Sequence, residues 1–481
     1  MSLIDAARTR APGSGVVVRS IPPLAVVVAT AAAMGALVGS SPRLGVVSVA
    51  GMLAGALALA LRPPLITLVL SWLVLAPVLQ NDANGNSLGH MPALLLYRLP
   101  PLLFLAWMVY DRVRDERRTR LVWQDWLPAA LVALIVVSLV VRPPHNPAAA
   151  GNPFTDSLYW NLGIPIILYY VCAFGRLGRT GESRIMLALI AGGALSALLG
   201  FAERATGVDL WGAGTITALG GYAVNTLTGT LSNPTVFGEV TGASAVLSAS
   251  LLVWRAPNVW WRRGALVALA ITLPATVLTY ERAPVVAVVV GVLLIVASRR
   301  QVWNAALIFA LCAALAGLLT WGMIATSVVE RRVSDAGTVQ TRVELAKRSV
   351  QLITEHPIIG TGYGTFDEVK NLPGTGSVRV PLGLFDTSHN TFLTILVELG
   401  VLGFALMVGH WAWVVRGRIR SWRRGAVVPW LAVGWLALVA VYVVNAMLID
   451  MRFFSYAALL PWIALGCLRR GSPGGAGSID G

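Results

Sequence analysis

Three side chains in this sequence suit proton transfer and phosphate binding, and each stands at the edge of an apolar segment. His389, in "FDTSHNTFL", lies where a polar stretch turns apolar, and Asp386 is placed to orient its ring. An imidazole can accept or donate a proton near neutral pH. Arg282 stands in "TYERAP", between two apolar runs, and Arg342 stands in the first turn of a helical pattern. Because a planar guanidinium suits bidentate capture of phosphate oxygens, an arginine such as Arg282 is a candidate for binding a phosphate group.

Each of these three residues also has a structural interpretation. His389 could be an interfacial residue that caps a helix together with its neighbours. Arg282 could pair with Glu281 or extend its side chain to the membrane interface. Arg342 could be a solvated charge. The residue types leave both interpretations open, so the elements that hold them must be considered.

The composition is that of a polytopic membrane protein. Of 481 residues, 56% are hydrophobic and only 12% are charged, and the mean hydropathy is +0.73. Soluble domains carry about 25% charged residues. The net charge of +15 would suggest nucleic-acid binding in a soluble protein, but here the positive-inside bias of membrane loops accounts for it. No cleavable signal sequence is predicted. We therefore expect a lipid bilayer, and no nucleic acid, as partner.

About fourteen apolar segments are long enough, or nearly so, to cross a bilayer as helices. Because several are short, we expect about twelve to fourteen transmembrane helices in an all-α fold. The segments are roughly 22–40, 44–61, 63–80, 92–110, 125–141, 157–175, 184–201, 233–254, 264–280, 283–298, 303–326, 390–413, 425–448 and 453–468.

The distribution of basic residues predicts the orientation of these helices. Most of the 37 Lys and Arg residues fall in segments that face the cytoplasm if the N-terminus is inside. The short loops of the other side hold only Arg43, Arg142, Arg204, Arg282 and Arg452. We therefore expect a multi-pass protein of the inner (plasma) membrane with both termini in the cytoplasm.

Two predicted outer segments, 202–232 and 327–388, are longer than simple connectors, and loops of that length are usually functional. Within the second, residues 341–356 are expected to form an amphipathic helix along the outer membrane surface. Thr341 and Glu344 stand in capping-box spacing at its start. The expected apolar stripe consists of Val343, Ala346, Val350 and Ile353.

The predicted organisation therefore has five parts. They are a cytoplasmic tail (1–21), eleven transmembrane helices (22–326), the outer segment (327–388), three further transmembrane helices (389–468) and a disordered cytoplasmic tail (469–481).

No metal or cofactor is predicted. Cys172, Cys312 and Cys467 lie in apolar runs without a CxxC or Cys/His cluster, so neither a disulfide nor a zinc site is expected. The sequence contains no Walker loop, GxGxxG unit or HExxH motif.

Polar residues inside apolar runs are further candidates, because ionisable groups within a membrane are functional by default. Glu239 and Glu398 could each be a proton or ion site, or could accept hydrogen bonds from Arg98 or another helix. Asn233 precedes a proline where a span opens, which would expose backbone polar groups to a cavity. Tyr363, on the outer side, belongs either to an interfacial belt or to a sugar-stacking surface.

Four segments carry a resemblance to a known family. They are "GTLSNPTVFGE" (229–239), "LTYERAPVVAVVVG" (278–291), "TRVELAKRSVQLITEHPIIGTGYGTF" (341–366) and "SHNTFLTILVELGVLG" (388–403). The most specific part is the H-P-x-x-G-x-G-x-G-x-F run followed by His-Asn at a span entrance. This region, roughly 225–405, resembles the O-antigen ligase and polymerase (WaaL/Wzy-type) superfamily of bacterial membrane glycosyltransferases. The N-terminal spans resemble that family only as membrane helices.

The resemblance implies a GT-C-like enzyme that inverts the anomeric centre without metal or ATP. It would transfer a glycan from a polyprenyl-diphosphate (undecaprenyl-type) carrier to a hydroxyl of a lipid, glycan or protein acceptor on the extracytoplasmic side. On the family pattern His389 is the base, and Arg282 and Arg342 hold the diphosphate, although Glu281 stands where serine is usual. His356 is expected to be structural.

We therefore expect His389, Arg282 and Arg342 to be catalytic. The expected substrate-binding residues are Arg282, Arg342, Arg348, Asn390, Tyr363 and Asn233. Arg348 is otherwise interpreted as a solvated or lipid-facing charge. The alternatives are a polymerase that uses the same donor, a transporter of a small solute or ion, and a noncatalytic partner in envelope assembly.

Overall fold

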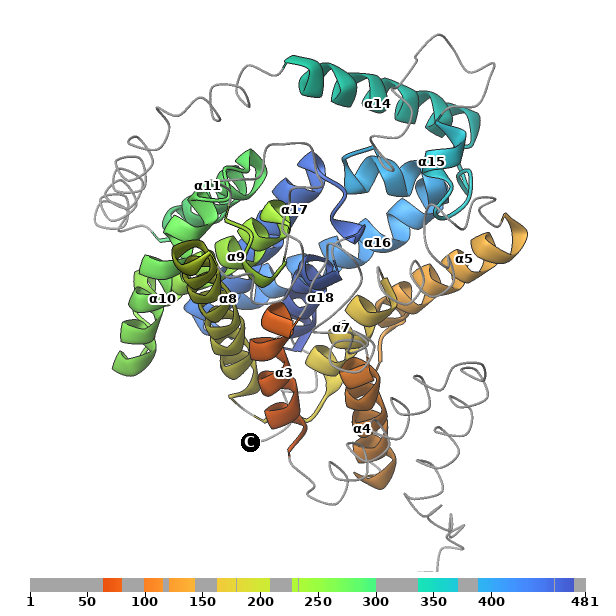
Figure 1. Ribbon diagram of the computed structural model, residues 1–481. Coiled ribbons are helices and arrows are strands. Elements are labelled where there is room, and N and C mark those ends of the chain that lie inside the picture. Colours follow the sequence, from red (N-terminus) through yellow and green to blue (C-terminus); the bar gives the residue numbers. More distant parts are fainter. Residues whose placement is uncertain are drawn as a thin grey trace, which may run out of the picture. The chain divides into compact units, whose positions relative to one another are not determined.

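The structure is a computed structural model, and every regular element that it describes is a helix (Figure 1). The described residues are 64–79, 99–115, 121–142, 162–178, 180–207, 227–231, 233–299, 336–370, 388–453 and 455–470. The predicted spans 22–40, 44–61 and 303–326 lie outside them, as do Arg98 and Asp386.

Eleven of the predicted spans fall within the described residues, and each coincides with a helix. Among the described helices, five are long and apolar enough to cross a membrane, which confirms the all-α membrane fold. They are η3 with α5 (Trp123–Trp126 and Leu127–Val141), α8 (Gly181–Thr206), α9 (Pro234–Val253), α16 (Thr391–Arg423) and α17 (Pro429–Leu448). The other six are α3 (Leu65–Leu79), α4 (Leu99–Asp115), α7 (Ile164–Phe174), α10 (Val259–Val277), α11 (Arg282–Ala297) and α18 (Ser455–Arg470).

Among the five, α9 is the helix most enclosed by its neighbours. It packs against α8, α10, α11 and α17. Small residues make this approach close: Gly238 faces Pro284 of α11, and Ser244 donates a hydrogen bond of 2.9 Å to the backbone oxygen of Ile190 in α8. Membrane helices depend on such small and hydroxyl-bearing residues, because lipid gives no hydrophobic drive for helices to associate.

Contacts between helix ends agree with the predicted alternation of loops. Arg142, after α5, donates to the backbone oxygen of Gly360 (2.7 Å), and both are predicted to face outward. At the other end, Arg418 contacts Glu182, and both are predicted to lie at the cytoplasmic side. α16 continues to Arg423, so its last basic residues belong to the helix and not to a loop.

Two helices of the predicted outer segment are described, α14 (Ala336–Glu355) and α15 (Phe366–Val369). In Figure 1, α14 lies beside α15 and α16, and α14 and α16 are in contact. α14 begins before the predicted start, so the capping box at Thr341 is wrong, and Arg342 lies in the second turn instead of the first.

The buried face of α14 also differs from the predicted stripe. Val343 and Val350 are exposed, whereas Leu345 and Leu352 are buried. These two leucines form an apolar cluster with Phe366 of α15 and Val397 of α16. The stripe prediction is wrong for Val343 and Val350, whereas Ile353 is half-buried and packs against this cluster. The spacing of apolar residues allows two faces, and packing against α16 selected the face with the leucines.

Candidate active site

The Gly-rich run after α14 is built into a break in α16. Gly400 has a positive φ of 64° and interrupts the helix. In a continuous helix the N–H groups of Val401 and Leu402 would bond to the carbonyls of Val397 and Glu398. Here they donate instead to Pro357 (2.8 Å) and Ile358 (3.1 Å) of the run.

The carbonyl groups that this break leaves open are taken up by the same run. Thr361 N–H donates to Val397 O (2.8 Å), and Gly362 N–H donates to Glu398 O (3.0 Å). Backbone groups at membrane depth must find partners within the protein. The exchange of hydrogen bonds satisfies that requirement and joins the run and the first part of α16 into one unit. It also explains the glycines, because a side chain at Gly360 would overlap the backbone of Glu398.

We expect Gly400→Ala to destabilise the protein by more than about 2 kcal/mol, because alanine disfavours the left-handed backbone and its Cβ would overlap the carbonyl of Ile358. The measurement is thermal unfolding in detergent. Gly409→Ala is the matched control, since nothing lies within 4 Å of the added Cβ in the same helix. Equal unfolding temperatures for the two variants would contradict the assigned role of the break.

His389 stands at the start of this unit in a strained conformation. Its φ is 53°, a left-handed value that few residues other than glycine adopt. Neighbouring hydrogen bonds hold it there. The Ser388 hydroxyl donates to the Asn390 carbonyl (2.8 Å), and the Asn390 side chain accepts from the N–H groups of Phe392 and Leu393 (3.0 Å each). Such strain persists only where the surroundings enforce it, and it clusters at functional sites.

The same segment is attached to the turn between α17 and α18. Asn390 Nδ2 donates to Met447 O (3.0 Å), and Thr391 Oγ1 accepts from Met451 N–H (2.9 Å). These bonds place His389 beside Asp450, which lies in that turn.

Three charged groups from three elements act on the half-buried imidazole of His389. Burial lowers the pKa of His389 to about 4, Arg342 of α14 and Lys370 after α15 lower it as well, and Asp450 opposes them. The ring is therefore neutral at physiological pH and can accept a proton. Of the two cations, Lys370 is buried and paired with Asp367, so the exposed Arg342 is the one placed to attract an anion.

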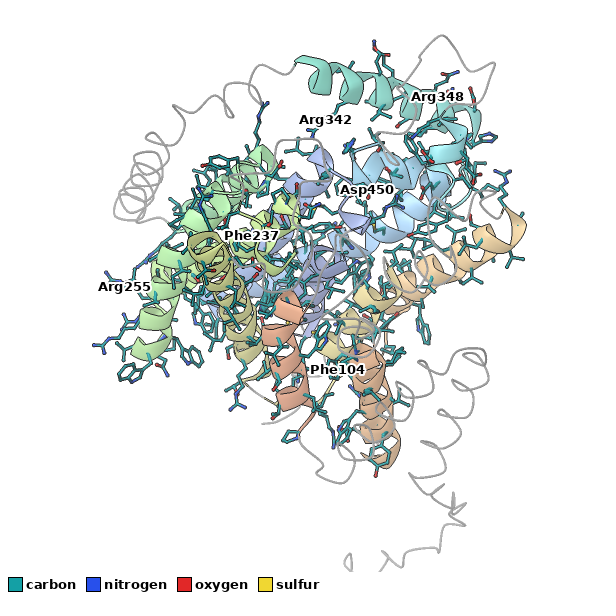
Figure 2. All side chains as sticks on the ribbon, viewed as in Figure 1. Phe104, Phe237, Arg255, Arg342, Arg348 and Asp450 are labelled. Atoms are coloured by element: carbon teal, nitrogen blue, oxygen red, sulfur yellow. The ribbon has the colours of Figure 1, made fainter. Side chains whose placement is uncertain are left out.

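The sequence position of Arg342 explains why it faces this site. It precedes Leu345, Ser349 and Leu352 by helical spacing, and those residues form the buried face of α14. In Figure 2, Arg342 lies on the side of α14 toward α16 and α17, and Asp450 lies on that side too. The structure thus brings together two of the three predicted catalytic residues, His389 and Arg342.

Arg282, the third, is exposed and is the first residue of α11. α11 packs on α17, with Gly291 facing Val441. Arg282 precedes Gly291 along α11 by about 13 Å. Asp450 follows Val441 by a similar distance, just past the end of α17 at Leu448. Since the two helices run in opposite directions under the predicted alternation, Arg282 stands at the level of Asp450.

A buried ion network lies behind His389, and sequence reasoning missed it. Arg452 donates to both carboxylate oxygens of Asp450 (3.1 and 2.9 Å) and to Glu398 of α16 (2.8 Å). The ring of Tyr363 lies 5.4 Å from the Arg452 guanidinium carbon. Nearby carboxylates raise the pKa of Arg452 well above its ordinary value, so it stays charged. Two features of the sequence pointed to this network. The turn "IDMRF" contains both an acid and a base, and Glu398 lies in an apolar run, where a carboxylate is stabilised by a cation.

The other predicted binding residues make structural contacts. Arg348 is only 1% exposed, so its interpretation as a solvated or lipid-facing charge is wrong. Its guanidinium donates to the carbonyls of Val369 (2.8 Å) and Lys370 (3.1 Å), which holds the end of α15 against α14. Tyr363 is buried, and Asn233 caps α9 as Asn390 caps α16. Their roles as substrate ligands remain predictions.

Glu239 is the second acid that the sequence placed inside a span. It is fully buried in α9, and neither carboxylate oxygen has a hydrogen-bond partner among the described residues. Its role stays open between a proton or ion site and a structural group.

The described fold is that of an all-α polytopic membrane protein, with a half-buried histidine of lowered pKa near Arg342 and Asp450 at one end of its helices. Residues 267–408 of this chain match the family model described as O-Antigen ligase. The match confirms the resemblance to the O-antigen ligase and polymerase superfamily for this region, which contains three of the four resembling segments, and 229–239 precedes it. The matched region contains Arg282, Arg342, Lys370 and His389, whereas Asp450 and Arg452 follow it. No curated protein matches the sequence.

Proposed function

We propose that the protein is a glycosyltransferase of O-antigen ligase type. It transfers a glycan from a polyprenyl-diphosphate carrier to an acceptor hydroxyl on the extracytoplasmic side of the inner membrane. The observation that carries the proposal is the neutral imidazole of His389 beside Arg342, Lys370 and Asp450. A base next to cations is what the attack of a hydroxyl on a sugar diphosphate requires.

In this mechanism His389 takes the proton of the acceptor hydroxyl while the hydroxyl oxygen forms a bond to the anomeric carbon. The bond between that carbon and the diphosphate oxygen breaks, and the electron pair leaves with the diphosphate. Arg342 and Arg282 stabilise the negative charge that develops there. Asp450 favours the imidazolium that forms, because it raises the pKa of His389. A single displacement inverts the anomeric configuration.

The diphosphate is a sufficient leaving group, so the step needs no ATP. The lipid tail of the carrier would lie in the bilayer beside the helices. Arg452 does not touch the substrate in this mechanism: it holds Asp450 in place and balances Glu398.

Ligase and polymerase use the same donor and differ only in the acceptor. The test is reconstitution of the purified protein in liposomes with a carrier-linked glycan, with and without a candidate acceptor, followed by mass analysis. We expect the glycan on the acceptor and free polyprenyl diphosphate. Growth of carrier-linked chains would identify the polymerase alternative. Movement of labelled solute without glycan transfer would identify the transporter. The absence of all of these activities would favour a noncatalytic role in envelope assembly.

Arg342→Gln is expected to change the pH profile as well as the use of donor. Removing this cation removes one cause of the lowered pKa of His389, so the pKa rises from about 4. Because the neutral ring is the active form, kcat/KM then begins to fall at a higher pH as the solution is acidified. We also expect kcat/KM for the donor to fall about 10- to 100-fold at neutral pH. The measurement is kcat/KM as a function of pH.

Lys347→Gln is the matched control for this variant. Lys347 is an exposed cation on the same helix, paired with Glu344 at 3.1 Å, and it is not among the groups that act on His389. It should leave the acid limb and donor kinetics unchanged. An Arg342→Gln profile that superimposes on the wild-type profile would contradict the electrostatic coupling of Arg342 to His389.

A further inference from the structure

A second group of charged residues lies at the end of the helices opposite to His389, on the side predicted to face the cytoplasm. It consists of Arg112 of α4, Arg176 before α8, Arg418 of α16 and Arg470 of α18, around Glu182 of α8. We call it the arginine cluster. Four separate parts of the chain contribute to it, so it is not a simple run of loop charges.

Backbone and carboxylate contacts account for part of this charge. Arg112 donates to the carbonyl of Phe174, and Arg470 donates to that of Gly175 (2.7 Å). Both therefore act at the C-terminal end of α7, where the helix dipole favours cations. Arg418 contacts the carboxylate of Glu182. The adjacent Arg469 is not available, because Asp125 binds it at 2.8 and 3.0 Å.

Within the described part of the chain, these contacts leave two donors of Arg418 unsatisfied. Arg418 is 1% exposed, yet its Nε and Nη1 have no hydrogen-bond partner among the described residues. Arg112 lies within electrostatic range of both Arg176 and Arg470, and the carboxylate of Glu182 lies within electrostatic range of both Arg418 and Arg470. Buried charged donors without acceptors are costly, so a ligand that supplies acceptor oxygens would be stabilised here.

We propose that the arginine cluster binds a phosphate group, with Arg418 at its base and the exposed Arg176 at its rim. The phosphate is either that of an anionic phospholipid headgroup in the adjacent leaflet or inorganic phosphate. Guanidinium groups suit phosphate oxygens in geometry and charge. Basic pockets between helices at a cytoplasmic surface are the usual sites for such headgroups. The site is separate from the proposed transferase chemistry and does not depend on it.

The test is native mass spectrometry of the full-length protein after extraction from bilayers of phosphatidylcholine and phosphatidylglycerol. We expect the wild-type protein to retain phosphatidylglycerol preferentially. Arg176→Gln should weaken that retention about fivefold, the effect of removing about one surface arginine, and Arg418→Gln should weaken it at least as much. Arg263→Gln is the matched control, because Arg263 is also exposed at the predicted cytoplasmic side but stacks on Trp260 of α10.

The outcomes separate the two sources of phosphate. Displacement of the retained lipid by inorganic phosphate, or thermal stabilisation by phosphate without lipid preference, assigns the site to free phosphate. Retention that resists phosphate assigns it to the lipid headgroup. Equal retention of both lipids without any phosphate effect, or an equal loss in Arg263→Gln, overturns the proposal. Arg176→Gln decides alone if Arg418→Gln does not accumulate.

Discussion

Replacement of His389 by alanine is expected to lower the rate of glycan transfer by about 10²- to 10⁴-fold, the usual contribution of a positioned general base. The reason lies in three features of the structure. The imidazole is neutral at physiological pH, it lies beside Arg342 and Lys370, and neighbouring hydrogen bonds hold its backbone in a left-handed conformation. The measurement is the single-turnover rate in liposomes with a carrier-linked donor.

His356→Ala is the matched control for this prediction. His356 is exposed after α14, in the same outer segment, and only its backbone bonds hold the chain there. We expect transfer by this variant to remain close to that of the wild-type protein. His389→Ala protein that inserts, unfolds at the wild-type temperature and still transfers glycan at the wild-type rate would remove His389 from the mechanism.

The second large effect is expected from Arg452→Leu, which should destabilise the protein by about 3–5 kcal/mol. The substitution leaves Glu398 and Asp450 buried without the cation that they share. Loss of one partner from a buried ion pair is costly because the remaining charge stays away from water. Since Asp450 also acts on His389, we expect reduced transfer even where the variant folds. Thermal unfolding in detergent measures the first effect and transfer assays measure the second.

Two further variants test whether buried charge is the cause. Arg204→Leu removes an exposed arginine at the end of α8, on the same predicted side, and should leave the unfolding temperature almost unchanged. Arg452→Leu combined with Glu398→Gln buries one charge fewer and should recover part of the loss. A double variant less stable than Arg452→Leu alone would mean that packing of the long Arg452 side chain, and not charge balance, dominates.

The break in α16 gives the motif of this domain a physical meaning. The H-P-x-x-G-x-G run exchanges four backbone hydrogen bonds with Val397, Glu398, Val401 and Leu402. Glu398 then uses its side chain to hold Arg452. The outer segment, the first turns of α16 and the turn after α17 are thereby connected through one short stretch of chain. His389 and Arg342 belong to the elements so connected, which is why residues distant in sequence share one site.

The sequence by itself determined the class of protein, the helical spans among the described residues, and a resemblance over roughly 225–405 that includes most of the matched domain, 267–408. It also predicted His389 and Arg342 as site residues. These properties depend on local quantities, namely the length of apolar runs, the placement of arginines and short motifs. Such quantities can be read along the chain without knowing what packs against what.

Only the tertiary structure decided which face of α14 is buried, that Arg348 holds α15, and that Asp450 and Arg452 stand behind His389. Each depends on partners far apart in sequence, as in the bond between Arg452 and Glu398. The sequence does not show whether a charged residue in a loop contacts a charged residue in an apolar run. Packing alone brings them within hydrogen-bond distance, and burial then makes the contact strong.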